Sequence, residues 1–104
     1  MHEVEFTQEQ RVEFFLAVSG AVSEFPFIGN ATDAVDSGNR LFVAYEFKLD
    51  FRKYFLTFDL RFGDTLVLTC WADDGNEVEM AEFPLGNLRR DFVVWFKEFF
   101  NERD

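Results

Sequence analysis

The stretch LFVAYEFKLDFRKYFLTFDLRF, residues 41–62, alternates apolar and polar side chains over most of its length. A period of two is typical of β-strands that bury one face of a sheet. The pattern therefore predicts one strand over residues 41–49 and a second over residues 53–62. The apolar, inward-facing set comprises Leu41, Val43, Tyr45, Phe47, Leu49, Tyr54, Leu56, Phe58, Leu60 and Phe62.

Two short loops join these two strands and a third strand into a meander. A tight turn is predicted at residues 51–52, with Asp50 opposite Lys53, because this register keeps both apolar sets on one face. The next loop is predicted to hold three residues, 63–65, since a two-residue loop would turn the following leucines outward. The third strand, residues 66–72, is then expected to point Leu66, Leu68 and Cys70 inward and Val67, Thr69 and Trp71 outward.

A second hairpin is predicted at Asp74-Gly75, a dipeptide that favours tight turns. A fourth strand follows over about residues 77–83. Its outward side chains are predicted to be Glu77 and Glu79, and its inward side chains Val78, Met80 and, near the end of the strand, Glu82.

Helices are predicted on both sides of the strands. Thr7 and Gln10 match a capping box that opens a helix from residue 8 to about residue 19 or slightly beyond. A last helix is expected over residues 88–101, with Asn87 as its cap. The predicted core faces are Val12, Phe15, Leu16, Ser19 and Val22 in the first helix, and Leu88, Phe92, Trp95, Phe96 and Phe99 in the last.

The segment 24–39 is rich in Gly, Asn, Asp and Ser, and it predicts a long ordered loop pinned by Phe25, Phe27 and Ile28. The expected fold is therefore α+β: an N-terminal helix, a four-stranded antiparallel meander and a C-terminal helix. Both helices are expected on one sheet face. A length of 104 residues fits a single domain over residues 1–104.

The chain has 20 acidic and 10 basic residues and a net charge of −10. The excess lies in two segments: residues 1–39 hold seven acids and one base, and residues 73–82 hold five acids and no base. Nucleic acids and anionic membranes are bound by basic surfaces, so neither is expected as a direct partner. A basic protein is the partner that this charge favours.

Residue types that commonly carry catalysis are scarce. His2, the only histidine, lies in a terminus expected to be frayed over residues 1–6. We interpret it as an exposed residue without a catalytic role. Cys70, the only cysteine, is predicted in the core, without the accessible, electropositive setting of a nucleophile. An EF-hand calcium loop that started at Asp73 would place Gly75 at a position that requires a ligand side chain, so the calcium-loop pattern fails. No enzyme activity, cofactor or metal is expected.

The location in the cell is expected to be the cytoplasm. A single cysteine fits a reducing compartment. The start MHEVEFTQEQ is polar and acidic, unlike a secretory signal. No apolar run approaches the ~20 residues of a membrane-spanning helix.

The candidate contact surface combines carboxylates with outward-facing aromatic residues. It comprises Asp73, Asp74, Glu77, Glu79, Phe42, Phe55 and Trp71. Glu77 and Glu79 are expected to project from one strand face, about 6.8 Å apart, and the acidic N-terminal third could add a second row. Two alternatives stay open: the acids only solvate a hairpin, or the loop 24–39 covers the aromatic face.

In size, charge and lack of catalytic residues, the chain resembles small acidic inhibitors encoded by phages, such as anti-CRISPR and anti-restriction proteins. That resemblance implies a stoichiometric inhibitor whose carboxylates occupy a basic nucleic-acid-binding site, as a DNA mimic does. The alternative is a structural or assembly protein, or a chaperone-like homodimer, that uses the aromatic outer sheet face. The helix–sheet–helix order with an acidic edge is also similar to frataxin-like domains, which would imply iron binding.

Overall fold

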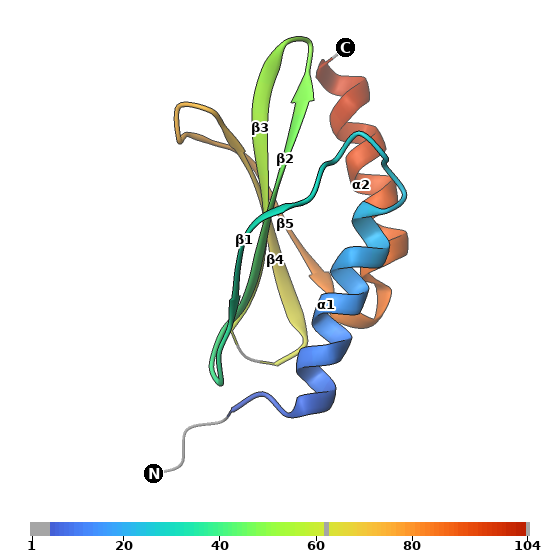
Figure 1. Ribbon diagram of the computed structural model, residues 1–104. Helices are drawn as coiled ribbons and strands as arrows, with labels where there is room; N and C mark the ends of the chain where they lie inside the picture. The colour runs from blue at the N-terminus through green and yellow to red at the C-terminus, as the bar shows by residue number, and fades with distance from the viewer. Residues whose placement is uncertain (1–4, 62, 104) are drawn as a thin grey trace.

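The computed structural model describes residues 5–61 and 63–103, and these form two layers, with two helices on one face of an antiparallel sheet (Figure 1). The five strands of this described part lie in chain order, β1-β2-β3-β4-β5. The elements are α1 (Gln8–Val22), β1 (Ala31–Asp36), β2 (Leu41–Leu49), β3 (Arg52–Leu60), β4 (Thr65–Ala72), β5 (Glu77–Pro84), a 3₁₀ turn (Leu85–Asn87) and α2 (Leu88–Arg103). The α+β class and the common face of both helices are confirmed.

The prediction of four strands is wrong, because part of the expected loop 24–39 forms the edge strand β1. This strand pairs antiparallel with β2, from Ala31 opposite Tyr45 to Asp36 opposite Leu41. Its sequence, ATDAVD, is poor in strand-forming residues and mostly exposed, so no side-chain pattern marks it. Backbone pairing to the free edge of β2 accounts for the strand.

Both predicted registers in the meander are shifted by two residues. The β2–β3 turn is at Asp50 and Phe51, with φ values of 52° and 67°, and Lys48 lies opposite Lys53. Between β3 and β4, Asp59 lies opposite Val67, so the predicted three-residue loop is also wrong. A shift of two leaves every side chain on its predicted face. Phe62 lies outside the described residues.

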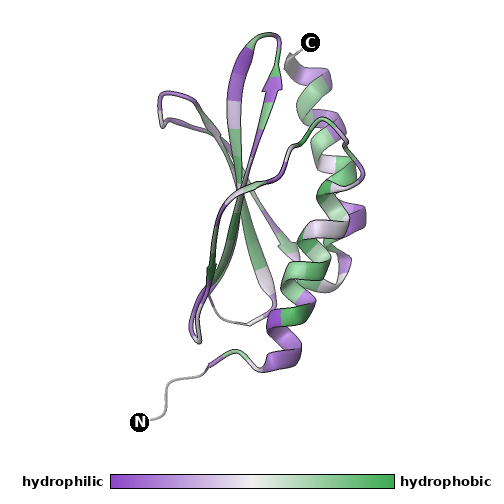
Figure 2. Cartoon of the chain, in the orientation of Figure 1, coloured by the Kyte–Doolittle hydropathy of each residue, from purple (hydrophilic) through white to green (hydrophobic). Residues whose placement is uncertain are grey.

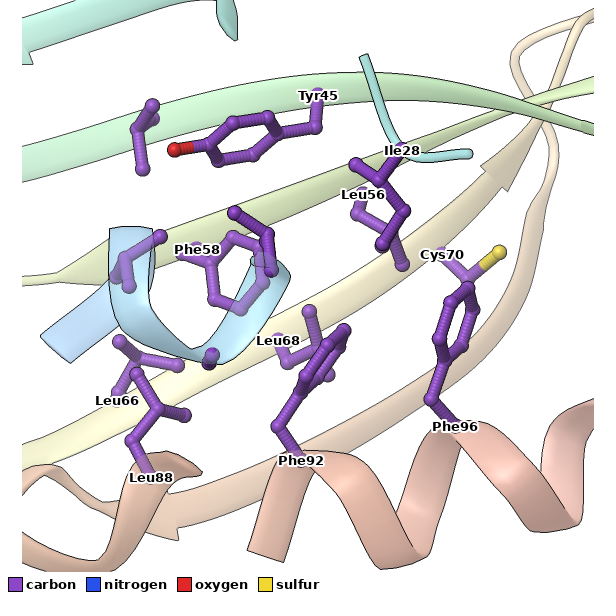
Figure 3. Close-up of a cluster of buried hydrophobic side chains, with 14 of the residues drawn as sticks. Ile28, Tyr45, Leu56, Phe58, Leu66, Leu68, Cys70, Leu88, Phe92 and Phe96 are labelled. Atoms are coloured by element: carbon purple, nitrogen blue, oxygen red, sulfur yellow. The ribbon is translucent and has the colours of Figure 1, made fainter. Parts of the chain in front are cut away.

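The core lies between the layers and is rich in phenylalanine. Figure 3 shows Phe92 and Phe96 of α2 pointing toward the side chains of the sheet, with Cys70 among them. The core stripe predicted for α2 is confirmed, since Leu88, Phe92, Phe96 and Phe99 are buried and Trp95 packs against them. Figure 2 shows the hydrophilic residues gathered at the hairpin ends and at the start of α1.

The capping box of α1 is confirmed, but its predicted core face is not. The Gln10 N–H donates to Thr7 Oγ1 at 3.1 Å, and the Thr7 N–H donates to Gln10 Oε1 at 2.8 Å. Leu16 is 68% exposed and Val12 is 47% exposed. The buried residues of α1 are Phe14, Val18, Ala21 and Val22. Apolar residues occur on more than one side of this helix, so spacing alone selected the wrong side.

The start of the described chain is attached to the sheet. The Phe6 N–H donates to the Gly38 carbonyl oxygen at 2.7 Å, and Phe6 packs against the core. Fraying, which we expected over residues 1–6, therefore does not extend to Phe6. Residues 1–4, His2 among them, lie outside the described residues.

An ion pair links α1 to the edge strand β1. Arg11 Nε donates to Asp36 Oδ1 at 2.7 Å. This hydrogen bond lowers the pKa of the Asp36 carboxyl below its ordinary value, and it raises the pKa of Arg11. A carboxylate with a depressed pKa in the folded state stabilises the fold above the pKa of the unfolded chain. That contribution is lost as the pH falls through the folded-state pKa.

Asp36→Asn is therefore expected to lose less stability than wild type when the pH falls from about 5 to about 2. Urea unfolding at each pH measures the difference, which we expect to be small and to shrink in high salt because both side chains are exposed. Arg11→Gln should flatten the pH profile equally, and the double variant should add nothing. An unchanged pH profile in either single variant would contradict the coupling.

Candidate protein-binding surface

Three predicted site residues form a row on the face of the sheet opposite the helices. Phe55 of β3 lies opposite Trp71 of β4, and Trp71 lies opposite Glu77 of β5. Paired residues in a sheet point to the same face. Their core-facing neighbours Leu56 and Cys70 are fully buried, so this row projects away from the helices. We call these three residues the outer row.

The outer row is held in place by its neighbours. The Trp71 indole N–H donates to Thr57 Oγ1 at 2.9 Å, which fixes the orientation of the ring. Both Phe55 and Trp71 are half-buried, so each still offers part of its ring to a partner. A rigid aromatic group binds a partner with little loss of side-chain entropy.

Phe42 projects from the same face but does not join the outer row. It lies opposite Asp59, whereas Phe55 lies opposite Glu46, four residues further along β2. Four residues of strand correspond to about 13 Å. The Arg40 guanidinium lies over the Phe42 ring, 4.8 Å from its centroid, and also pairs with Asp59 at 3.2 Å. Phe42 is thus covered by its own neighbours.

The loop 24–39 does not cover the outer sheet face, which excludes one alternative from the sequence. Phe25 packs on Phe96 with ring centroids 4.8 Å apart, and Phe27 packs on Phe100 at 5.1 Å. Both contacts are to α2, on the helix side of the sheet. Residues 31–36 continue the plane of the sheet as β1. The outer row is therefore open within the described part of the chain.

The β4–β5 hairpin carries the predicted acidic residues beside the outer row. Its end projects away from the helix layer (Figure 1). The Asp74 carboxylate accepts hydrogen bonds from the Asn76 backbone N–H at 3.0 Å and from Asn76 Nδ2 at 2.9 Å, which fixes the turn. Asp73, Asp74 and Glu77 are exposed.

Glu79 is on the other face, contrary to the sequence prediction. It lies opposite Cys70, a core residue, and one of its carboxylate oxygens is buried. The register shifts by one residue between Cys70 and Trp71, which leaves Val78 as an extra residue on β5. Glu77 and Glu79 therefore point to opposite faces of the sheet, although they are two positions apart. Met80 therefore points outward and is 53% exposed, which also contradicts its predicted burial.

The same register shift applies to Glu82. It lies opposite Val67 and faces outward, so the buried acid that the predicted fourth strand required does not occur.

The acidic segments do not merge into one surface. β1, with Asp33 and Asp36, and β5 are the two edges of the sheet, about 19 Å apart at the usual strand spacing. Asp73 and Asp74 also share a hollow of about 460 Å³ with Arg52 and Lys53 of the β2–β3 hairpin. The second acidic row envisaged from the sequence therefore lies away from the hairpin.

In the described part of the chain, the residues that could carry catalysis or hold a metal either lie in the core or do not cluster. The Cys70 thiol is fully buried. Burial raises the pKa of the Tyr45 phenol, whose ring lies within the core cluster (Figure 3). Within the described residues, no three His, Cys, Asp or Glu side chains gather in a way that could hold a metal ion. No helix of the described chain is long and apolar enough to cross a membrane.

Comparison of the chain with protein-family models, with curated proteins and with solved structures gave no match.

Proposed function

We propose that this chain is a protein-binding module that inhibits a basic, nucleic-acid-binding partner by stoichiometric occupation of its binding site. The observation that carries the proposal is the outer row, Phe55, Trp71 and Glu77, which crosses three strands on the open sheet face. It lies beside the exposed carboxylates Asp73 and Asp74 of a projecting hairpin. The binding itself needs no catalysis.

The chemistry of the surface supports this assignment. Aromatic residues at the centre of an interface supply most of its binding energy, and charged groups at the rim supply specificity. Carboxylates on a fixed hairpin present negative charge to lysine and arginine side chains, as phosphates do. The net charge of −10 steers a basic partner toward the molecule and raises the association rate at low salt.

The test is affinity capture from the native host's lysate, read by mass spectrometry, with wild type and the variant D73N/D74N/E77Q. Asparagine at position 74 keeps one of the two accepting oxygens, so the hydrogen bond from the Asn76 backbone N–H is retained and the one from Asn76 Nδ2 is lost. Exposed charge pairs contribute about 0.2–1 kcal/mol each, so we expect the loss of three charges to weaken binding about 3- to 100-fold. Wild-type binding should also weaken in high salt.

A matched control removes the same number of charges elsewhere. D33N/D64N/E98Q neutralises three exposed acids away from the β4–β5 hairpin, and it should bind the partner like wild type. The captured protein should lose nucleic-acid binding when one equivalent of wild-type chain is added. Equal binding by the hairpin variant, or a captured partner without a basic surface, would refute the proposal.

A further inference from the structure

The tip of the β2–β3 hairpin exposes an aromatic side chain in a strained backbone conformation. Phe51 has a φ of 67° and its side chain is fully exposed. Glycine and asparagine are the residues that favour this left-handed region, and a bulky side chain there is costly. The fold gains no packing from this ring. A strained and exposed residue of this kind points to a role in binding.

The tip also carries three cationic side chains on an acidic chain. Lys48 lies opposite Lys53, and Arg52 adjoins Phe51. The acidic groups nearby are Asp50 in the turn, Glu46, which pairs with Lys53 at 3.6 Å, and Asp73 and Asp74, which share a hollow with Arg52 and Lys53. Lys48 and Arg52 are both exposed. The tip therefore presents an aromatic ring with an exposed cation on each face of the hairpin, Lys48 on one and Arg52 on the other.

A shallow groove with the complementary character lies on the helix layer. It runs between α1 and the 3₁₀ turn, with a volume of about 670 Å³, and its lining is mostly apolar. Its apolar side is formed by Val12, Leu16 and Leu85, and its rim carries Glu9 and Glu13. Val12 and Leu16 are exposed, one helical turn apart on α1, so they offer a ready apolar contact.

We propose that these two features bind each other between copies of the chain. Phe51 of one copy inserts against Val12 and Leu16 of the next, and Lys48 and Arg52 approach Glu9 and Glu13. Opposite charges rim the apolar contact on its two sides, which is the pattern of a matched interface. The occupant of the groove is thus a second copy of this chain.

The positions of tip and groove require that the contact forms between different copies. The tip lies at one end of a molecule 48 Å long, and the groove lies along the first half of α1, toward the other end (Figure 1). One copy therefore cannot fill its own groove. Two antiparallel copies can fill each other's grooves in a closed two-fold dimer, and copies that use tip and groove on different neighbours form head-to-tail rings or open chains.

The contact is small, so the association is expected to be weak. One aromatic side chain buries about 150–250 Å², and the tip and groove together fall below the ~1,000 Å² of a stable interface. We therefore expect reversible assembly in the range from about 10 µM to about 1 mM. Sedimentation velocity across that range should show a rising average mass for wild type.

Two variants test the two sides of the contact. Phe51→Gly removes the ring and relieves the strained φ, so loss of assembly in this variant cannot be due to unfolding. Leu16→Glu puts a third acid into the groove at an exposed position. Each is expected to be monomeric over the whole range. Val94→Glu likewise replaces an exposed apolar side chain with glutamate, but on α2, and it should assemble like wild type.

A mixture of the two defective variants gives the decisive result. Phe51→Gly keeps an intact groove and Leu16→Glu keeps an intact tip, so an equimolar mixture should form a species of two copies and nothing larger. A monomeric wild type, a monomeric mixture, or two variants that assemble normally would each overturn the proposal. Loss of assembly in Trp71→Ser would place the interface on the outer sheet face and would overturn it too.

Discussion

Replacing Phe96 with alanine is expected to lower the free energy of unfolding by about 3–5 kcal/mol, the usual cost of deleting a buried phenylalanine ring. Phe96 is fully buried. Its ring lies 4.8 Å from that of Phe25, 5.1 Å from that of Phe47 and 4.6 Å from that of Phe100, centroid to centroid. It therefore joins α2 to both the 24–39 segment and the sheet, and its loss leaves a cavity between three elements.

This cost is a large share of the about 5–15 kcal/mol that stabilises a typical domain. Urea unfolding followed by tryptophan fluorescence measures it, since Trp95 lies next to Phe96 on α2. Lys97→Ala, at the neighbouring exposed position, is the control and should change stability by no more than about 0.5 kcal/mol. A cost below about 1 kcal/mol for Phe96→Ala would contradict the packing of α2 described above.

Phe14→Ala is expected to cost about 3–5 kcal/mol, whereas Leu16→Ala should stay within about 0.5 kcal/mol of wild type. The two residues are two positions apart on α1, but Phe14 is fully buried and Leu16 is 68% exposed. The sequence pattern placed Leu16 in the core and left Phe14 outside it. The pair therefore decides directly which side of α1 faces the sheet.

Both variants should be measured by urea unfolding under the same conditions, with helical content from circular dichroism as a check. Alanine favours helix at least as well as either original residue, so helix propensity adds no cost to either variant. A larger loss for Leu16→Ala than for Phe14→Ala would mean that α1 is rotated from the orientation in this structure.

The sequence predicted the central strands and their buried faces because side-chain alternation is a strong signal. It did not predict their register. A pattern with a period of two is unchanged when one strand moves by two residues, and both hairpins differ from prediction by that amount. The positive φ values of Asp50 and Phe51 fix the true turn, and although aspartate is enriched in this conformation, phenylalanine does not signal it.

The elements that were missed have no periodic signal of their own. β1 is held by backbone pairing along the edge of β2, and its alanine and aspartate residues do not indicate a strand. On α1, valine, leucine and phenylalanine occur on several sides, so the helical period identifies the helix but not its buried face. Packing against α2 and the rest of the core selects the face that carries Phe14.

The candidate surface was predicted in part. Phe55, Trp71 and Glu77 form one row because their strands are adjacent and their positions have matching parity. Phe42 and Glu79 do not join it. Phe42 lies too far along β2, a distance that depends on the register. Glu79 lies beyond the irregularity opposite Cys70, and one inserted residue reverses every later prediction on β5.

The order of the strands also has a consequence for how the chain folds. Each strand pairs only with strands adjacent to it in the sequence, so every hairpin can form across a short loop. Closing short loops costs little chain entropy, and topologies of this kind fold rapidly. The packing of α1 against α2 is different, because it joins segments from opposite ends of the chain. We therefore expect the sheet to form hairpin by hairpin, and the meeting of the two helices to be the step that carries the largest entropic barrier.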